Sequence, residues 1–165
     1  MIIAGWAGIG KTTLAKKYKN VIDIESSPYK WDYSGLTPSD YEKMKGRKDR
    51  VSNKNYPINY INAIKDAETK YDVVCVWCHP YNAFPYYEQY GIDYVICYPS
   101  KEAIVDYEKR MRDRGNSEEF IAGVMNSFEK RWVEFSNNPH EKIILDKGET
   151  LESRLIKMGV KLIEK

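Results

Sequence analysis

The sequence has almost no net charge, although 30% of its residues are charged. Its 26 lysines and arginines nearly balance its 24 aspartates and glutamates, which leaves a formal net charge of +2 over 165 residues. A chain with this balance has no strong overall field that would by itself attract nucleic acid. Nucleic acid remains a possible partner that the net charge does not support, and any anion binding must depend on local groups.

Long apolar runs are also lacking. No segment approaches the roughly 18 consecutive apolar residues that a membrane-spanning helix needs. The first residues, MIIAG, run directly into an expected strand without the charged leader of a signal peptide. We therefore expect a cytoplasmic protein without a membrane partner.

Cysteine is scarce, and its three occurrences lie in the apolar runs VVCVWC and VICY. An odd, small number excludes a disulfide framework and favours buried, reduced thiols. The spacing from Cys75 through Cys78 to His79 matches that of haem attachment. However, strand residues three apart face opposite sides, which argues against a haem or zinc site here.

Apolar runs alternate with helix-period stretches along the whole chain, which is typical of βαβ units on a parallel sheet. We expect one domain over residues 1–165, since about 100 to 200 residues is the usual size. The pattern predicts an α/β, three-layer P-loop NTPase fold: a five-stranded parallel sheet flanked by helices, with a small lid. The expected strands are Ile2–Ala4, Val21–Ile24, Val73–Cys78, Tyr94–Tyr98 and Lys142–Leu145, and the expected helices lie near Thr12–Tyr18, Tyr56–Lys70, Lys101–Arg114, Ser117–Phe135 and Thr150–Met158.

The segment 26–55 lacks this periodicity. It holds two prolines, two glycines and the charged run KMKGRKDR at 43–50. We interpret it as an insertion on the acceptor side of the site. Its basic run, with Tyr29, Trp31 and Tyr33, suits stacking and phosphate contact on a nucleotide or a single strand. A solvated insertion with a few packed aromatic residues is the alternative.

The strongest motif is GWAGIGKT at residues 5–12, which matches G-x-x-x-x-G-K-[ST] at every defined position, after an apolar strand and before a helix. Such a loop turns its backbone N–H groups toward phosphate oxygens, and the helix dipole adds to the attraction. Lys11 is expected to bridge the β- and γ-phosphates of ATP, and the Thr12 hydroxyl to hold Mg²⁺. The predicted triphosphate-binding residues are Gly8, Ile9, Gly10, Lys11, Thr12 and Thr13.

Two carboxylates follow the second expected strand. Strand alternation places Asp23 and Glu25 on the same side, at the carboxyl end where ligands bind in open α/β sheets. One carboxylate can reach Mg²⁺, which we assign to Asp23 together with Thr12, and the other can accept the proton of an attacking hydroxyl. A solvated acidic loop is the alternative.

Two features of other P-loop classes are missing. The third strand ends in His79 and Pro80 and lacks the terminal acidic residue of motor-type ATPases, and no guanine-reading NKxD motif occurs. These absences favour a kinase over an ATPase or a GTPase. His79 is a candidate for the acceptor pocket, although a simple hydrogen bond within the turn is the alternative.

The stretch KEAIVDYEKRMRDRG, at residues 101–115, is rich in arginine. Arg110 and Arg114 stand four apart and share one helix face, whereas Arg112 points elsewhere. Two guanidinium groups on one face can clamp a transferring phosphoryl group, and a lid of this kind, at about 101–118, excludes water. A solvated basic face paired with Glu108 and Asp113 is the alternative.

Together the N-terminal P-loop, the D-x-E after the second strand and the arginine-rich stretch resemble the adenylate-kinase-like and shikimate-kinase-like branch of nucleotide and small-molecule kinases. VIDIESSPYKW, NYPINYINAIKDAETKYDVV and YPSKEAIVDYEKRMRDRGN are, more narrowly, similar to small P-loop kinases of phage and prophage genomes. The resemblance implies catalytic roles for Lys11, Asp23, Glu25, Arg110 and Arg114, with ATP and Mg²⁺.

The resemblance leaves the phosphate acceptor open. A nucleotide, a nucleoside or a similar small molecule with a hydroxyl or phosphate is the main expectation, and a hydroxymethylated base in phage DNA is the alternative. A regulatory nucleotide-binding protein without efficient transfer is the competing class of function.

Overall fold

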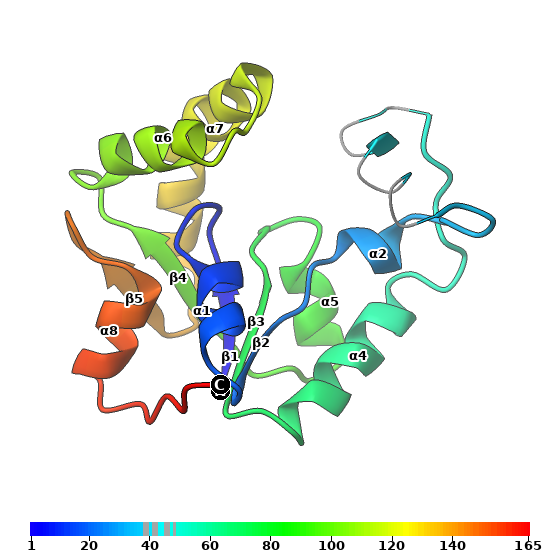
Figure 1. Cartoon of the computed structure of the whole chain (residues 1–165), viewed down its shortest axis with the longest axis horizontal. Helices are drawn as coiled ribbons and strands as arrows, with labels where there is room; N and C mark the ends of the chain where they lie inside the picture. The colour runs from blue at the N-terminus through cyan, green and yellow to red at the C-terminus, as the bar shows by residue number, and fades with distance from the viewer. Residues whose placement is uncertain (38–39, 41–42, 45–46, 48) are drawn as a thin grey trace.

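In the computed structural model, which describes residues 1–37, 40, 43–44, 47 and 49–165, an all-parallel sheet forms the centre of the molecule (Figure 1). Its strand order is β2-β3-β1-β4-β5. The strands are β1 (Ile2–Gly5), β2 (Val21–Asp23), β3 (Val73–Trp77), β4 (Val95–Pro99) and β5 (Lys142–Leu145). The α/β fold with a five-stranded parallel sheet, expected from the sequence, is therefore confirmed.

The central strands are covered on both faces. Nearly every residue of β1, β3 and β4 is buried, as expected for strands that read as continuous apolar runs in a parallel sheet. Gly5 of β1 pairs with Trp77 of β3, and Asp23 of β2 pairs with Cys75. This register brings the carboxyl ends of the three strands to one edge of the sheet.

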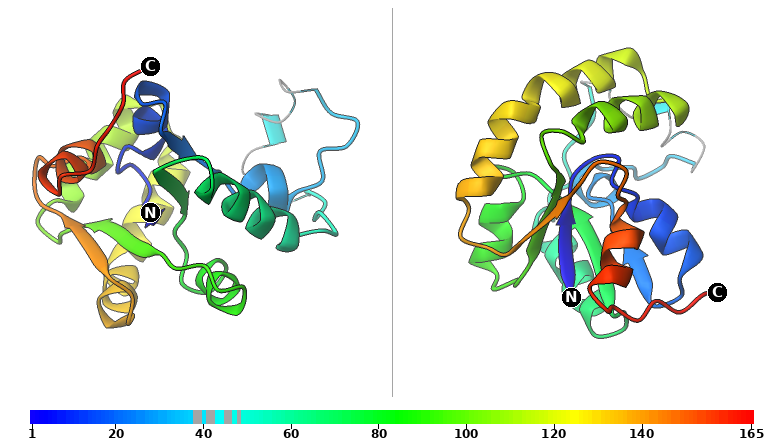
Figure 2. Two further views of the ribbon diagram at one scale, coloured as in Figure 1. Left: turned by 90° about the horizontal axis from the view of Figure 1, so that it is seen from below. Right: turned by 90° about the vertical axis from the view of Figure 1, so that its left-hand side faces the viewer.

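Helices lie on both faces of the sheet (Figure 2). One layer holds α1 (Lys11–Lys17) and α8 (Leu151–Lys157). The other holds α4 (Ile58–Glu68), α5 (Phe84–Gln89) and the C-terminal half of α7 (Glu118–Asn137). Buried aromatic rings join this second layer: Tyr60 contacts Tyr87, and Phe84 contacts Phe135.

Two short helices were not expected from the sequence. The helix α5 has six residues, FPYYEQ, which is too short to show a helical period. The helix α2 (Ser27–Lys30) lies in the segment 26–55. Within that segment Trp31 pairs with Ser52, and the Arg50 guanidinium stacks on the Trp31 ring at 4.2 Å. Residues 45–46 and 48 of the basic run lie outside the described residues.

Local signals fix where the last two helices begin. The Ser117 side chain caps α7 by accepting a hydrogen bond from the Phe120 N–H. Two glutamates in the first turn also interact favourably with the positive end of the helix dipole. Thr150 caps α8 through a reciprocal capping box with Ser153.

The helix α6 (Ile104–Asp113) and the N-terminal half of α7 arch beyond the carboxyl ends of the strands (Figure 2). The arch contacts the P-loop directly, since a Cβ added at Gly8 would lie 3.4 Å from Tyr107 Cδ1 and 3.8 Å from Met111 Cγ. Both of these α6 residues are buried. None of the helices in the described part of the chain combines the length and apolar character that crossing a membrane requires.

Candidate active site

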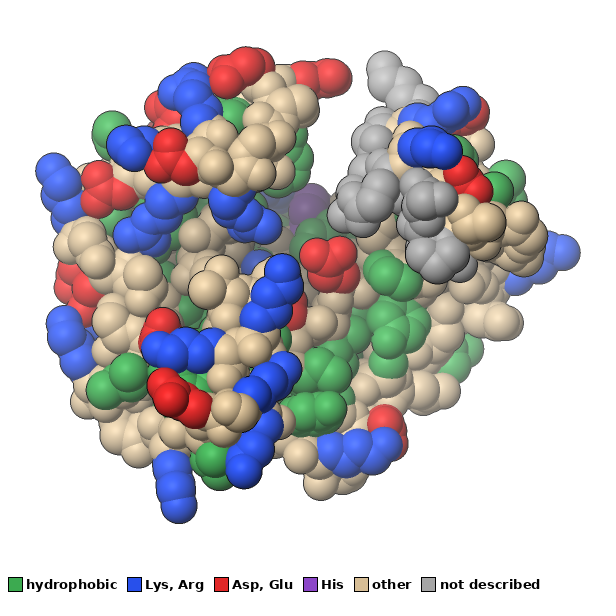
Figure 3. All heavy atoms as spheres, viewed as in Figure 1, with side chains coloured by type: hydrophobic (Ala, Val, Ile, Leu, Met, Phe, Trp, Pro, Cys, Tyr) green, Lys and Arg blue, Asp and Glu red, His purple; other side chains and the backbone are tan. Residues whose placement is uncertain are grey.

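A cleft of about 840 Å³ opens at the carboxyl edge of the sheet. It is bounded by the P-loop turn, by the segments that follow β2 and β3, and by the arch of α6 and α7. Figure 3 shows the hollow beneath the arch. This is the position in which open α/β sheets bind ligands.

The P-loop turn depends on glycine at two positions. Gly8 has φ +80° and Gly10 has φ +102°, a region of backbone conformation that other residues rarely adopt. Gly10 is also the N-cap of α1, so the turn feeds directly into the helix. Of the predicted triphosphate-binding residues, Gly8, Lys11 and Thr12 line the cleft, whereas Ile9, Gly10 and Thr13 do not.

Ile9 has an anchoring position instead. Its side chain is fully buried, and its carbonyl accepts a hydrogen bond of 3.1 Å from the Leu151 N–H at the start of α8. Thr13 is exposed on α1. Any contact of these two residues with a phosphate would therefore come from the backbone, which is how P-loops hold phosphates in general.

The Lys11 ammonium lies over the P-loop. Its Nζ donates to the carbonyl oxygens of Gly5, at 2.7 Å, and Trp6, at 3.0 Å. Among the described carboxylates none forms an ion pair with it, so its charge is compensated only by neutral carbonyl groups. A phosphate in the cleft would offer this cation a far stronger partner.

Thr12 and Asp23 meet at the mouth of the P-loop. The Thr12 hydroxyl donates to Asp23 Oδ2 at 2.6 Å, and Asp23 Oδ1 is buried without a hydrogen-bond partner in the described part of the chain. A buried, unpartnered carboxylate oxygen is costly unless a ligand satisfies it. Hydroxyl and carboxylate oxygens are the donors that Mg²⁺ prefers, so this pair fits the ion.

The described residues hold no cluster of three or more His, Cys, Asp or Glu side chains that could bind a metal.

A pair of buried tyrosines ties the ends of β2 and β3 together. The Tyr60 hydroxyl donates to the Ile24 carbonyl and accepts from the Trp77 N–H, both at 3.0 Å. Tyr87 donates to the Trp77 carbonyl at 2.8 Å. Burial raises the pKa of Tyr60, so it stays a neutral donor. The backbone just before Glu25 is therefore held firmly, while the Glu25 side chain is exposed and lines the cleft.

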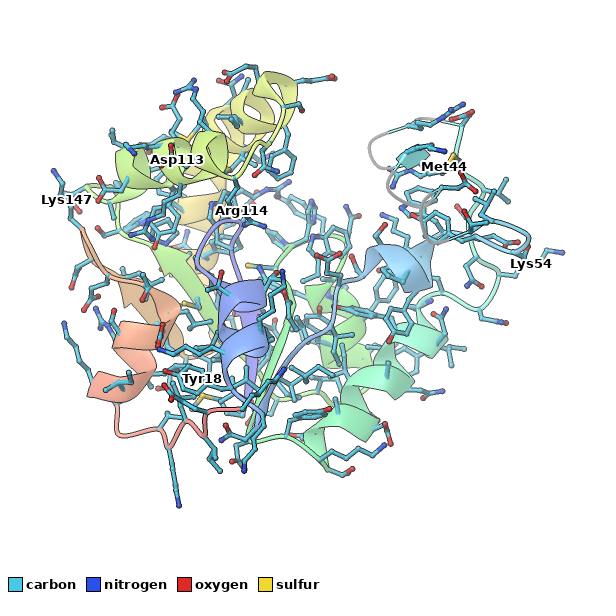
Figure 4. The ribbon with its side chains drawn as sticks, viewed as in Figure 1. Tyr18, Met44, Lys54, Asp113, Arg114 and Lys147 are labelled. Atoms are coloured by element: carbon cyan, nitrogen blue, oxygen red, sulfur yellow. The ribbon has the colours of Figure 1, made fainter. Side chains whose placement is uncertain are left out.

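The three arginines of α6 and its C-cap have different surroundings. Arg114, the C-cap residue, lines the cleft and in Figure 4 lies between α6 and the P-loop turn. Arg112 pairs with Glu108 at 2.9 Å and Glu118 at 3.1 Å, away from the cleft. This matches the expectation that Arg112 points elsewhere.

Arg110 does not line the cleft. Its Nη2 donates to the Glu149 carbonyl at 3.0 Å, and its guanidinium stacks on the Tyr107 ring at 4.5 Å. Four residues of α-helix rise about 6 Å, so Arg110 and Arg114 sit at different heights along one face. The structure thus brings Arg114, but not Arg110, to the P-loop.

The carbonyl that Arg110 contacts belongs to a rigid loop between β5 and α8. The Glu149 carboxylate pairs there with Arg154 and with Lys157, the latter at 2.6 Å, and these cations lower its pKa to about 2. The ionised carboxylate also accepts from the Asp146 N–H. The loop therefore stays fixed at neutral pH.

Arg131 of α7 belongs to none of the sequence motifs, but it lines the cleft beside Ser127 and Val124. The signal that marks it is spacing: these three residues stand at i, i+3 and i+7, on one helix face. Phe120, on the same helix, also lines the cleft and is 46% exposed. His79, expected as a candidate for the acceptor pocket, lines the cleft as well.

No protein-family model matches the sequence, and no curated protein sequence matches it at a significant level. Among solved structures, the chain is similar to the shikimate kinase of Bacteroides thetaiotaomicron, with a TM-score of 0.50 and 18% sequence identity. The alignment covers 95% of this chain and 94% of that one. This likeness over nearly the whole length confirms the α/β P-loop fold expected from the sequence, and at this identity it shows the fold alone.

Proposed function

We propose that this protein is an ATP- and Mg²⁺-dependent kinase that transfers the γ-phosphoryl group to a hydroxyl or phosphate of a nucleotide, a nucleoside or a similar small acceptor. The observation that carries the proposal is the meeting of Thr12 with Asp23. A P-loop alone indicates that a protein binds a nucleotide and does not identify the reaction. Here a carboxylate with a buried, unpartnered oxygen lies 2.6 Å from the P-loop hydroxyl, in the same cleft as Lys11 and Glu25.

Each of these residues has a distinct role in the proposal. Lys11 binds the β- and γ-phosphates and follows the charge that develops on the migrating group. Thr12 and Asp23 would hold Mg²⁺, which supplies positive charge to the phosphate oxygens when bound. Glu25, exposed to the cleft, accepts the proton of the attacking hydroxyl.

The arch is proposed to act as the lid, at about 101–118, and the segment 26–55 to cover the acceptor side. A closed arch excludes water, which would otherwise compete with the acceptor for the phosphoryl group. Arg114 is already at the cleft, whereas Arg110 can reach a phosphate only if it leaves the Glu149 carbonyl on closure.

ATP consumption with and without pooled acceptors tests the proposal. The pools are nucleosides, nucleoside monophosphates, small hydroxy acids and hydroxymethylated DNA, each with labelled ATP and Mg²⁺. We expect the protein to consume almost no ATP alone and to consume it with one pool, because a closed arch would keep water from the phosphoryl group. Rapid hydrolysis without any acceptor would identify an ATPase, and ATP binding without consumption in every pool would identify a regulatory protein.

Neutralising Arg114 should lower turnover by about 100-fold, the scale of one lost electrostatic contact to the transition state, and should weaken ATP binding much less. Steady-state kinetics of Arg114→Ala measures both effects. Arg112→Ala is the matched control, since it removes the same charge from the same region on the face away from the cleft. Equal losses in the two variants would show that the arginines act only as a diffuse positive field. The turnover of Arg110→Ala tests whether Arg110 contacts the phosphoryl group after closure, which requires its hydrogen bond to the Glu149 carbonyl to break.

A further inference from the structure

Two side-chain nitrogens face each other across the wall of the cleft, just after the end of β3. His79 Nε2 lies 3.3 Å from Arg131 Nη2, and both residues line the cleft. A guanidinium nitrogen is a donor only. What the ring nitrogen contributes depends on which of its two nitrogens carries the proton.

The other ring nitrogen of His79 decides the tautomer. Nδ1 faces the backbone N–H groups of Tyr81, at 3.3 Å, and Asn82, at 3.1 Å, so it is the acceptor and Nε2 carries the proton. A doubly protonated ring would oppose donors at both nitrogens. Burial, and then the charges of Arg131 and Lys30, lower the pKa of His79, which agrees with a neutral ring.

Arg131 is fixed in its position by other contacts. Its Nη1 pairs with Glu134 at 2.9 Å, its guanidinium lies 5.2 Å from the centre of the Tyr81 ring, and Tyr81 in turn hydrogen-bonds Glu134. The side chains of Arg131 and Glu134 are only 18% and 17% exposed. The ion pair thus occupies Nη1 and leaves Nη2 directed at the imidazole.

The Asn82 side-chain amide also lies near this point, with its nitrogen 3.4 Å from His79 Nε2. An amide turned to present its oxygen would accept from Nε2–H. It would still leave Arg131 Nη2 facing a proton. The arrangement therefore needs an acceptor that both donors can share.

We propose that His79 and Arg131 form a binding site for an anionic oxygen of the phosphate acceptor, so that the acceptor carries a phosphate or carboxylate group besides the group that is phosphorylated. An oxygen anion about 2.8 Å from both nitrogens turns an unfavourable donor pair into two hydrogen bonds, one of them charge-assisted. The inference rests on the proposed kinase function and adds the substrate class.

The topology places this site next to the phosphate cradle. Trp77, two residues before His79, pairs with Gly5 of the P-loop across neighbouring strands. On the other side of β3, the segment after β2 carries Glu25 into the same cleft. An acceptor held by its anionic end at His79 lies in the same cleft as the proposed base and the migrating phosphoryl group.

Nuclear magnetic resonance of the His79 ring tests the site directly. The chain has two histidines, and His140, stacked on Tyr94 at 4.0 Å, does not line the cleft. In a His140→Gln protein every imidazole signal belongs to His79. Above the ordinary imidazole pKa of about 6.5, titration with inorganic phosphate or with acetate should shift the Nε2 resonance saturably. A response to phosphate alone assigns a phosphate monoester, and a response to acetate alone assigns a carboxylate.

Variants separate this site from the P-loop. The shift should persist when Lys11→Ala is added, because that change weakens only the phosphate cradle. Arg131→Ala should weaken anion binding by about 10- to 100-fold, the cost of one charge-assisted hydrogen bond. Lys130→Ala, which removes a neighbouring charge from the same helix without touching the cleft, should leave it unchanged. Arg131→Lys, checked by thermal unfolding, replaces the alanine variant if that one fails to fold.

Two results would overturn the proposal: no saturable shift with either anion, or a shift that survives Arg131→Ala and disappears with Lys11→Ala. Calorimetry of Mg-ATP binding on the same protein keeps the two claims distinguishable. ATP binding and transfer without an anion response would leave the kinase and remove the acceptor site. An anion response without ATP binding would leave an anion site at His79 and Arg131 but would remove both the kinase and the acceptor role of that site.

Discussion

Changing Lys11 to alanine is expected to lower phosphoryl transfer by at least about 100-fold, the scale lost with one preorganised electrostatic contact. The loss should appear mainly in turnover, because the negative charge that the Lys11 ammonium stabilises develops fully only while the γ-phosphoryl group is transferred. Folding should survive, since Nζ contacts only the carbonyl oxygens of Gly5 and Trp6 and joins no ion pair among the described residues. Steady-state kinetics and thermal unfolding of the variant measure the two effects.

Lys16→Ala is the matched control for this change. Lys16 lies on the same helix, α1, is exposed and does not line the cleft of the active site. Its loss removes the same charge and should leave transfer unchanged. If Lys11→Ala kept near-normal transfer, or if both variants lost equal activity, the P-loop would not be the site of catalysis.

The sheet and the P-loop were predictable because their determinants are local. The run GWAGIGKT needs glycine where φ is positive, and Gly8 and Gly10 occupy these positions. The strands were predictable because VVCVW and VICYP are apolar runs of the length that a buried parallel sheet requires. Alternation along a strand was also enough to place Asp23 and Glu25 at the cleft, and both line it.

The rest of the site depends on contacts between distant parts of the chain. The i+4 rule placed Arg110 and Arg114 on one face but could not show that the Glu149 carbonyl, 39 residues away, holds Arg110. Arg131 was hidden for the same reason, because its partner His79 is 52 residues distant. A helical period identifies a face, whereas the neighbour of that face is set by tertiary packing.

Asp23 and Glu25 should give different phenotypes when each loses its charge. Glu25→Gln keeps size and hydrogen bonding but removes the proton acceptor, so turnover should fall by about 10²- to 10⁴-fold while ATP affinity stays the same. Asp23→Asn keeps a group that can accept from the Thr12 hydroxyl but weakens the proposed metal site. It should raise the Mg²⁺ concentration for half-maximal activity by about 10- to 100-fold, the range for a lost metal-supporting contact.

Titration of Mg²⁺ at saturating ATP, followed by titration of ATP at saturating Mg²⁺, separates the two effects. Excess Mg²⁺ should restore much of the activity of Asp23→Asn and none of that of Glu25→Gln, because a metal ion can refill a weakened site but cannot replace a missing base. Glu152→Gln is a suitable control, since its carboxylate binds Lys17 and Tyr18 outside the cleft. Equal and mild effects at positions 23 and 25 would mean that the acidic pair belongs to a solvated loop and that the proton of the acceptor leaves by another route.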